Sequence, residues 1–257
     1  MARRFAVVNQ KGGVGKTTTV VNLAAALAKM NKRVLVVDYD HSAAGATTFL
    51  GQHGVADGEG GFSTAEFTLG QGRWSVCRDV HVPGLDLLPS SWRLANIEKE
   101  LLSDVLAGTR KLATALDGVD SQYDVILIDC VPSLGMLAVA AMAAGPEIII
   151  PVRLEPASLL PALYLFRDIT GLRERGVGPL RVFGVLGTFF NATANTPKKT
   201  LGDLKDIFGE AVFGTVIHTA QTLADAVGGG VPTVLAAPSS RAAKEYMDLA
   251  KEIVSRG

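Results

Sequence analysis

The chain has 257 residues, and 48% of them are hydrophobic, which is enough to form a buried core in one large α/β domain or two small ones. Lys and Arg together number 25, as do Asp and Glu, so the formal net charge is zero and the overall charge does not indicate a nucleic-acid-binding protein. The two cysteines, Cys77 and Cys130, are too few for a secreted disulfide scaffold and are typical of a reducing compartment.

The apolar segments do not have the pattern of a targeting or membrane-spanning sequence. The N-terminus is basic but lacks an apolar core of signal-peptide length before a glycine-rich loop begins. The longest apolar stretch, 134–152, is interrupted by Gly-Pro-Glu at 145–147, so we interpret it as a buried helix followed by a buried strand. We therefore expect a soluble cytoplasmic protein.

Short β-branched segments alternate with longer helical patterns along the chain. In chain order, we expect strands over 4–9, 33–38, 85–89, 124–129, 147–152, 181–189 and 211–217. Several are apolar throughout, which is typical of parallel strands covered on both faces. Between them we expect helices over 16–30, 95–107, 134–144, 159–175, 200–208 and 240–254. This alternation predicts an α/β fold with a doubly wound, mostly parallel sheet flanked by helices.

The chain shows no domain-scale linker, internal repeat or low-complexity tail, so we expect a single domain over 1–257. The segment 57–72 is rich in glycine and is the least core-like part. We expect a variable surface insertion around 52–80. Within it, Ser63 and Glu66 have the spacing of a capping box, which predicts that a short helix starts there.

The segment 10–18, QKGGVGKTT, lies between the first expected strand and the first expected helix, as a phosphate-binding loop does. Its glycines allow backbone N–H groups to converge on phosphate oxygens, and the helix N-terminus adds its positive end. We expect Lys16 at the β- and γ-phosphates, the Thr17 hydroxyl on Mg²⁺ and Thr18 at the α-phosphate. The expected nucleotide-binding residues of the loop are Gly12, Gly13, Val14, Gly15, Lys16, Thr17 and Thr18.

The strict G-x-x-x-x-G-K-[ST] pattern is not met, because Gln10 occupies the first glycine position and a second lysine, Lys11, follows it. In this feature the sequence resembles the ParA/MinD family of P-loop ATPases, the deviant Walker A group, and its ParA/Soj branch in particular. The resemblance covers nearly the whole chain and is weakest at 52–80. It implies a P-loop NTPase fold, ATP and Mg²⁺ as cofactors, and a homodimer with ATP. It also implies that Lys11 reaches across the dimer to the partner's nucleotide, as both a binding and a catalytic residue.

Two acidic positions follow expected strands, where ligands bind in this kind of sheet. Asp38 and Asp40 end the second strand, and Asp129 ends a hydrophobic strand of the Walker B type. The resemblance implies that Asp40, with Lys11 and Lys16, is catalytic because it polarises the attacking water. It gives Thr17, Asp40 and Asp129 as the Mg²⁺ residues.

The loop after Asp40 departs from the family pattern. His41 replaces a proline, and SAAG at 42–45 replaces QGN with one extra residue. We therefore expect slow hydrolysis that a partner protein accelerates. His41 is interpreted as a residue that caps the strand rather than one that transfers protons.

The nucleotide base is expected beyond the later strands. Asn191 ends one of them, and an amide can donate and accept at once, which suits adenine. His218 stands where the family usually has proline. We expect both as adenine-side contacts, with simple turn residues as the alternative for each.

The resemblance implies a ParB-type partner that stimulates hydrolysis, and nonspecific binding to DNA through Lys and Arg. However, the family's DNA-contacting arginines correspond to Thr193, Thr219 and Thr222 here. The sequence therefore leaves two functions open, an ATP-dependent dimer switch for chromosome or plasmid partition and a similar switch for a non-DNA cargo. Association with the nucleoid depends on which holds. The candidate replacement cations are Lys198, Lys199, Lys205, Arg241, Lys244, Lys251 and Arg256.

Three other functions are less consistent with the sequence. Membrane positioning of the MinD kind needs a basic amphipathic helix past the domain, but the stripe of 240–254 faces a core and the chain then stops, so we expect no membrane binding. A redox protein like the nitrogenase iron protein would need Cys77 and Cys130 in a shared cluster. A metabolic P-loop ligase or kinase would need a small acid for turnover. The residues of the apolar stripe are Ala242, Tyr246, Leu249, Ala250 and Ile253.

Overall fold

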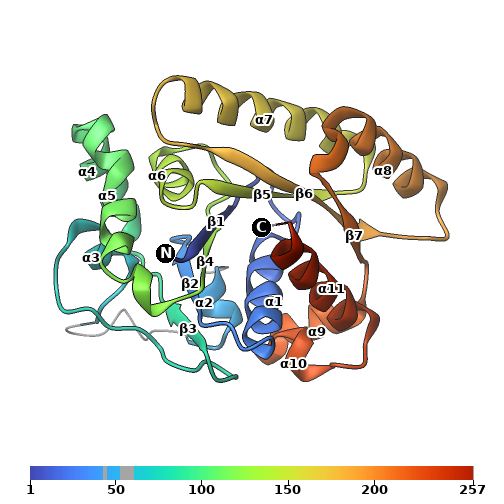
Figure 1. The fold of residues 1–257 in the computed structure, drawn as a ribbon, viewed down its shortest axis with the longest axis horizontal. Coiled ribbons are helices and arrows are strands. Elements are labelled where there is room, and N and C mark those ends of the chain that lie inside the picture. The colour runs from blue at the N-terminus through green and yellow to red at the C-terminus, as the bar shows by residue number, and fades with distance from the viewer. Residues whose placement is uncertain (43–44, 53–60, 257) are drawn as a thin grey trace.

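Seven parallel strands form one sheet in the order β3-β2-β4-β1-β5-β6-β7 (Figure 1). The computed structural model describes residues 1–42, 45–52 and 61–256. The predicted fold class is confirmed, and each expected strand is present within two residues at either end. The strands are β1 (Arg3–Val7), β2 (Val34–Tyr39), β3 (Leu85–Leu88), β4 (Val125–Cys130), β5 (Glu147–Arg153), β6 (Arg181–Phe190) and β7 (Val212–His218).

Helices cover both faces of the sheet and bury two hydrophobic clusters against it (Figure 1). One face carries α1 (Lys16–Lys29), α2 (Ala46–Phe49), α9 (Gln221–Gly229), α10 (Thr233–Ala236) and α11 (Arg241–Ser255). The other carries α3 (Thr64–Leu69), α4 (Leu94–Ser103), α5 (Val105–Asp117), α6 (Met136–Ala144), α7 (Leu159–Glu174) and α8 (Asn195–Phe208). Three short 3₁₀ turns lie at η1 (Asp120–Gln122), η2 (Pro156–Ser158) and η3 (Gly209–Ala211). Both faces of the central strands are therefore buried, which explains why those strands are apolar throughout.

The expected helix over 95–107 is wrong. The structure has two helices there, because Asp104 takes an extended conformation (φ −140°) and its carboxylate accepts a hydrogen bond from the Ala107 N–H, 3.1 Å away. An aspartate in this position caps a new helix better than it continues an old one. The expectation for 200–208 starts too late, since α8 begins at Asn195 and accommodates Pro197 in its first turn, where no N–H donor is needed. The short helices α9 and α10 were not expected from the sequence.

The capping box at Ser63 and Glu66 is confirmed, and α3 starts there. Ala65 and Phe67 of α3 are buried in the hydrophobic cluster that α4 and α5 share. Residues 53–60 of the expected insertion lie outside the described residues. The single domain over 1–257 and the surface insertion around 52–80 stay predictions.

The terminal helix α11 packs as predicted, with all five residues of its apolar stripe buried against α1 and β7. In the part of the chain that the structure describes, no helix combines the length and the apolar content that crossing a membrane requires.

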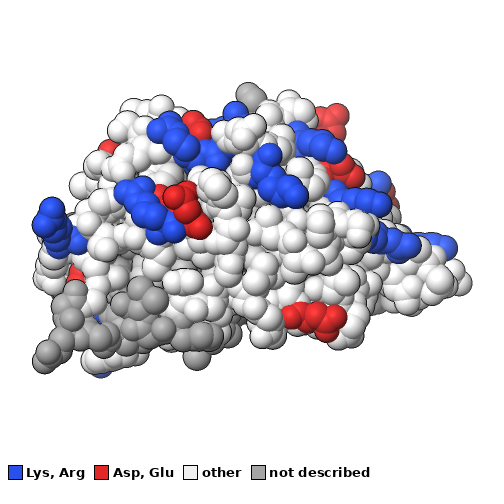
Figure 2. Space-filling model, turned by 90° about the horizontal axis from the view of Figure 1, so that it is seen from below, with Lys and Arg blue, Asp and Glu red and all other residues white. Residues whose placement is uncertain are grey.

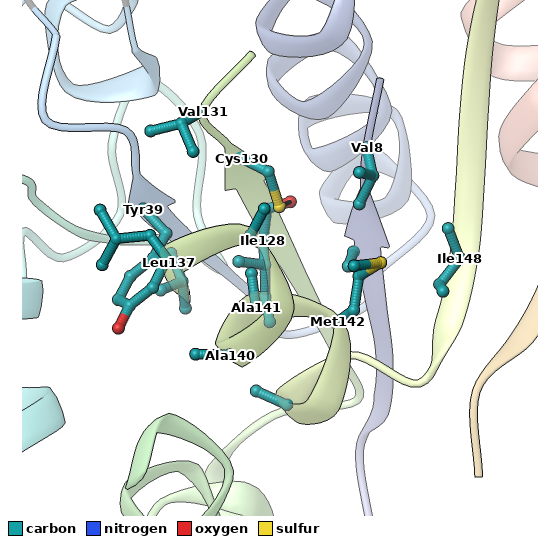
Figure 3. Packing of buried hydrophobic residues seen from close by; sticks show 14 of the residues in the cluster. Val8, Tyr39, Ile128, Cys130, Val131, Leu137, Ala140, Ala141, Met142 and Ile148 are labelled. Carbon is teal, nitrogen blue, oxygen red and sulfur yellow. Dashed lines mark hydrogen bonds between the residues drawn. The ribbon is translucent and has the colours of Figure 1, made fainter. Parts of the chain in front are cut away.

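The apolar stretch 134–152 forms α6 and β5, as expected (Figure 3). Small residues let α6 lie close to the sheet, with Leu137 beside Tyr39 of β2, Ala141 beside Ile128 of β4, and Met142 toward Val8 (Figure 3). Close approach continues at Gly145, where a Cβ would be 2.7 Å from the Ala6 backbone nitrogen. Packing this tight fixes β4, β1 and β5 relative to one another.

Gly184 in β6 provides a test of how tightly side chains pack against the other face of the sheet. A Cβ at this position would overlap the ring of Phe213, which is fully buried. Gly184→Ala is expected to lower the free energy of unfolding by about 1–3 kcal/mol, because the ring cannot move away without straining its neighbours. The measurement is urea denaturation followed by circular dichroism.

The matched control is Gly202→Ala in α8, where nothing among the described residues lies within 4 Å of the new Cβ. There the same substitution is expected to raise stability by about 0.4–1 kcal/mol, since it restricts the unfolded chain. Equal effects at the two positions would contradict the packing argument.

Candidate active site

The loop between β1 and α1 directs backbone N–H groups toward one point. Gly13 and Gly15 have left-handed backbone angles (φ 70° and 90°), which residues with a Cβ adopt only with strain. Gly15 is the N-cap of α1 and has no side chain to bond the first N–H groups of the helix. Those donors, and the positive end of the helix dipole, are therefore available to an anion.

Two buried polar side chains hold this loop on the neighbouring strands. The Asn9 amide donates to the Pro151 carbonyl oxygen of β5 (2.7 Å), and its oxygen accepts from the Lys11 N–H (2.9 Å). On the other side, the Thr188 hydroxyl of β6 donates to the Val14 carbonyl oxygen (2.9 Å). The loop is thus fixed at its start and its middle before any ligand binds.

Lys16 lies with its ammonium group among buried acidic residues. Burial lowers the pKa of Lys16 below its ordinary value, and the charges on Asp129 and Asp40 counteract this. Burial also raises the pKa of Asp129 well above its ordinary value, and the charges on Asp38 and Asp40 add to the effect. The nearby Thr17 hydroxyl and the charge on Lys16 lower the pKa of Asp129, against the effect of burial. The expected neighbours of the phosphates are therefore brought together.

The surroundings of Asp129 fit a magnesium ion. This carboxylate is fully buried, yet neither of its oxygens has a hydrogen-bond partner among the residues that the structure describes. Buried polar atoms without partners are rare and suggest a ligand or ion. Within 1–42, 45–52 and 61–256, no three His, Cys, Asp or Glu residues are grouped so that they alone could hold a metal. An ion held by Thr17, Asp40 and Asp129 would therefore take further oxygen ligands from phosphate and water, as Mg²⁺ usually does.

Asp38 holds the end of β2 and the start of the following loop. Its carboxylate accepts from the Asp40 N–H (3.1 Å) and from the Thr47 N–H (2.7 Å). A Cβ at Gly45 would collide with this carboxylate, so glycine is needed there. Asp40 in turn accepts from the Ser42 N–H (2.8 Å). Asp38 thus sets the position of Asp40, a role that the sequence alone did not reveal.

The loop that carries these contacts includes residues 43 and 44, which lie outside the described residues. His41 is exposed at its start. The interpretation of His41 as a residue that caps the strand stays a prediction.

Lys11 lies at the rim of the loop and is bound within its own chain. Its ammonium group forms an ion pair with Glu155 and donates to the Ser158 hydroxyl (3.3 Å). Glu155 also forms an ion pair with Arg153 (3.2 Å), whose guanidinium stacks on the Phe189 ring (4.5 Å to the ring centre). The sequence predicted the importance of Lys11 but not these partners, which lie after β5.

A cavity of about 310 Å³ opens beside the loop, between the ends of β6 and β7 and the helices α9 and α11. Its walls are mostly apolar, and Gly15 and Thr18 connect it to the phosphate-binding loop. Phe189 contributes its ring from a left-handed backbone conformation (φ 55°) at an irregularity in the β6–β7 pairing. Such strain in a bulky residue is uncommon and concentrates at functional sites. The residues that line the cavity are Gly15, Thr18, Thr188, Phe189, Ile217, His218, Thr219, Ala220, Gln221, Leu223, Ala224, Val227 and Tyr246.

Of the two expected base contacts, the structure places one in this cavity. His218 lines it. Asn191 is exposed, and its side-chain oxygen accepts from the Thr193 N–H (3.0 Å) and hydroxyl (2.8 Å) in a local turn. The role of Asn191 at adenine stays a prediction, and in this conformation its oxygen is already engaged.

Comparisons with known proteins agree with this geometry. A family model described as "AAA domain" (AAA_31) matches residues 2–178. The chain is 37% identical to the sporulation initiation inhibitor protein Soj of Bacillus subtilis, with all of both chains covered. It is 37% identical to the chromosome-partitioning ATPase Soj of Thermus thermophilus (99% of this chain and 96% of that protein), and 31% identical to the chromosome partitioning protein ParA of Caulobacter vibrioides (99% and 94%).

The chain belongs to the ParA/Soj family of P-loop ATPases. The resemblance inferred from the two lysines is thereby confirmed. Among solved structures, cobyrinic acid a,c-diamide synthase from Mycobacterium smegmatis with bound ADP and magnesium is 30% identical, with a TM-score of 0.81 over 98% of this chain and 93% of that one. A protein of this fold therefore holds a nucleotide and magnesium together.

Three side chains that support the site in this ParA/Soj-type chain were not found from the sequence. Asn9, Thr188 and Glu155 touch the phosphate-binding loop from three different segments. A polar residue at the end of an apolar strand was the available signal for Asn9 and Thr188. Glu155 follows β5 in a stretch with no pattern of its own, so only the folded chain shows its contact with Lys11.

Proposed function

We propose that this chain is an ATP-dependent dimer switch for DNA partition. The observation that carries the proposal is the pair of lysines around one phosphate-binding loop. Lys16 is buried beside Asp129 at the N-terminus of α1, whereas Lys11 stands at the rim, where a second molecule could approach. The relatives named chromosome-partitioning proteins support the proposed process.

In the proposed site, ATP binds with its phosphates on the loop from Lys11 to Thr18 and its base in the cavity lined by His218. The free N–H groups of α1 and the Lys16 ammonium neutralise the phosphates. Thr17, Asp40 and Asp129 hold Mg²⁺, which when bound stabilises negative charge on the phosphate oxygens. Asp40 orients the attacking water, because it is the acidic residue whose position Asp38 fixes at the edge of the loop.

Hydrolysis in this proposal is slow until a partner protein of the ParB type binds. The reason lies next to Asp40, which among the described residues is held by its N–H donating to the Asp38 carboxylate. A partner that binds beside Asp40 would place the water more often. The protein would then act in the cytoplasm, and on the nucleoid where it binds DNA.

In this proposal, Lys11 leaves Glu155 and crosses to the partner's phosphates when two ATP-bound chains meet. Lys11→Ala is expected to change ATP affinity by no more than about threefold, since an exposed ion pair contributes little. It should nevertheless abolish ATP-dependent dimerisation, measured by light scattering with a nonhydrolysable ATP analogue. Glu155→Gln is the matched variant, because it frees Lys11 without removing it and should leave dimerisation intact.

Lys16→Ala provides the contrast, with an expected loss of about 100-fold in nucleotide affinity, because a charge-assisted contact to phosphate disappears. A Lys11→Ala protein that dimerises as the unmodified chain does would show that Lys11 has no role across the interface.

Asp40→Ala tests the position of the water. It is expected to reduce turnover by a factor of about 100 or more while ATP stays bound, so the dimer should persist in ATP. Phosphate release and light scattering measure the two effects on the same sample. Asp206→Ala is the control, since Asp206 is an exposed residue of α8 with no ion pair among the described residues. Turnover at the normal rate in the Asp40 variant would refute the proposed role.

The cargo is a separate matter, because the family arginines are threonines here. Thr193 and Thr219 are exposed after the ends of β6 and β7. Nearby cations exist, since Lys198, Lys199 and Lys205 of α8 are exposed and have no acidic partner at ion-pair distance among the described residues. Figure 2 shows Lys and Arg side chains spread across one face as far as the side of the molecule that carries α8. Because these lysines could replace the family arginines, DNA is the first candidate cargo, and a non-DNA cargo is the second.

Binding to random duplex DNA separates the two candidates. With a nonhydrolysable ATP analogue, we expect binding that weakens steeply with salt, because phosphate contacts release counterions. The double variant Lys198→Ala, Lys199→Ala should reduce the slope of log affinity against log salt by about 2. Lys111→Ala in α5 is the control, since Lys111 is paired with Glu100 (3.2 Å) and is not one of the candidate replacement cations. The absence of nucleotide-dependent, salt-sensitive binding would exclude DNA as the cargo and favour the second candidate.

A further inference from the structure

Glu245 of α11 holds His218 at the mouth of the cavity by two separate contacts. One carboxylate oxygen accepts from the His218 backbone N–H (2.9 Å), and the other lies 2.6 Å from Nδ1 of the same residue. The imidazole also packs edge-on against Phe190, with 4.9 Å between ring centres. Both the position and the orientation of the ring are therefore fixed.

This arrangement determines which ring nitrogen carries the proton. In a neutral imidazole one nitrogen donates and the other accepts. A carboxylate oxygen 2.6 Å from Nδ1 favours the form with the proton on Nδ1, because an unprotonated Nδ1 would turn its lone pair toward that oxygen, even though the contact does not have hydrogen-bond geometry. Nε2 is then an acceptor. Among the described residues Nε2 has no hydrogen-bond partner. It is not fully buried, so it can be reached from outside the chain.

The cavity that His218 lines suits a flat ring bearing a donor. Ile217, Leu223 and Val227 give it apolar walls, and its volume of about 310 Å³ lies at the small end of ligand pockets. In such a pocket, one accurately placed polar group decides which ring is accepted. A fixed acceptor favours a ring that carries an amino group and disfavours one that carries an oxo group at the same place.

We propose that the Glu245–His218 pair is the base-selecting element of this site: Glu245 fixes the ring of His218 so that Nε2 accepts a hydrogen bond from the exocyclic amino group of adenine. This inference rests on the proposed function, in which the cavity takes the base of ATP. His218 is the residue that contacts the base, and Glu245 is a positioning residue.

The test compares ADP with inosine diphosphate, which has an oxo group in place of the amino group. Diphosphates avoid hydrolysis and ATP-dependent dimerisation. With the full chain and Mg²⁺ in isothermal titration, ADP is expected to bind about tenfold more tightly than inosine diphosphate, the effect of one hydrogen bond gained against one acceptor facing another. His218→Phe keeps a ring against Phe190 but removes the acceptor, so the preference should fall to about twofold or less.

Glu245→Gln makes the sharper variant. Its amide oxygen can still accept from the His218 backbone N–H, which directs the amide NH₂ toward Nδ1. Nδ1 must then accept, the ring proton moves to Nε2, and the fixed group becomes a donor. The preference should therefore vanish or reverse in favour of inosine diphosphate, an outcome that loss of structure alone would not produce.

Glu252→Gln is the matched control. Glu252 lies seven residues further along α11 and also ties it to β7, through the Gly214 N–H (2.8 Å) and the Thr215 N–H (3.0 Å), but it does not line the cavity. The tenfold preference should persist in this variant. Thermal melting of all three variants identifies any that fail to fold.

Equal binding of the two diphosphates by the unmodified chain would overturn this inference and leave the proposed function standing. An unchanged preference in both His218→Phe and Glu245→Gln would also overturn it. If neither diphosphate binds, the proposed function fails and the inference fails with it.

Discussion

The burial of charge at the end of β4 is the constraint on which the site depends. Asp129 is fully enclosed, is aligned in the sheet with Asp38 of β2, and lies close to Lys16 of α1. Enclosed carboxylates without hydrogen bonds are costly, and one lysine offsets only part of that cost. The folded site therefore carries an electrostatic imbalance that a cation bound there would relieve. The tight packing of α6 on the other face keeps β4 and β1 from moving apart to admit water instead.

A line of contacts connects the rim of the loop to the base cavity. Lys11 is bound to Glu155, Glu155 to Arg153, and the Arg153 guanidinium lies on the ring of Phe189, which lines the cavity and is held in a strained backbone conformation. If Lys11 leaves Glu155 during dimerisation, Glu155 neutralises the charge of Arg153 more completely, because the two cations no longer share it. The ring of Phe189, on which Arg153 stacks, then experiences a different charge. If the chain dimerises and binds a nucleotide as proposed, two ion pairs and one cation–π contact would link the two events.

The sequence predicted the parts of this protein that repeat a short local rule. The seven strands follow from apolar runs, α3 from its capping box, and the nucleotide loop from glycines and lysines between a strand and a helix. It failed where a single side chain decided the outcome, as at Asp104, which ends one helix and caps the next. It also could not show contacts between distant segments, such as Lys11 with Glu155 or His218 with Glu245. Neither Glu155 nor Glu245 stands in a recognisable sequence pattern, so only the fold shows that they contact Lys11 and His218.

The distribution of unpaired cations bears on how the family's role is carried out in this chain. The arginines expected after β6 and in α9 are absent, and their places hold Thr193 and Thr222. Yet α8 begins two residues after Thr193 and carries exposed lysines, and the first turns of α11 carry Arg241 and Lys244 beside the Glu245 that holds the end of β7. Positive charge thus remains next to the ends of β6 and β7 but sits on helices rather than on the loops. Charges on long, exposed side chains bind a polyanion without fixed geometry and with strong dependence on salt. If this chain binds DNA, the contact is therefore weaker and more readily reversed by salt than one made by arginines held in the loops.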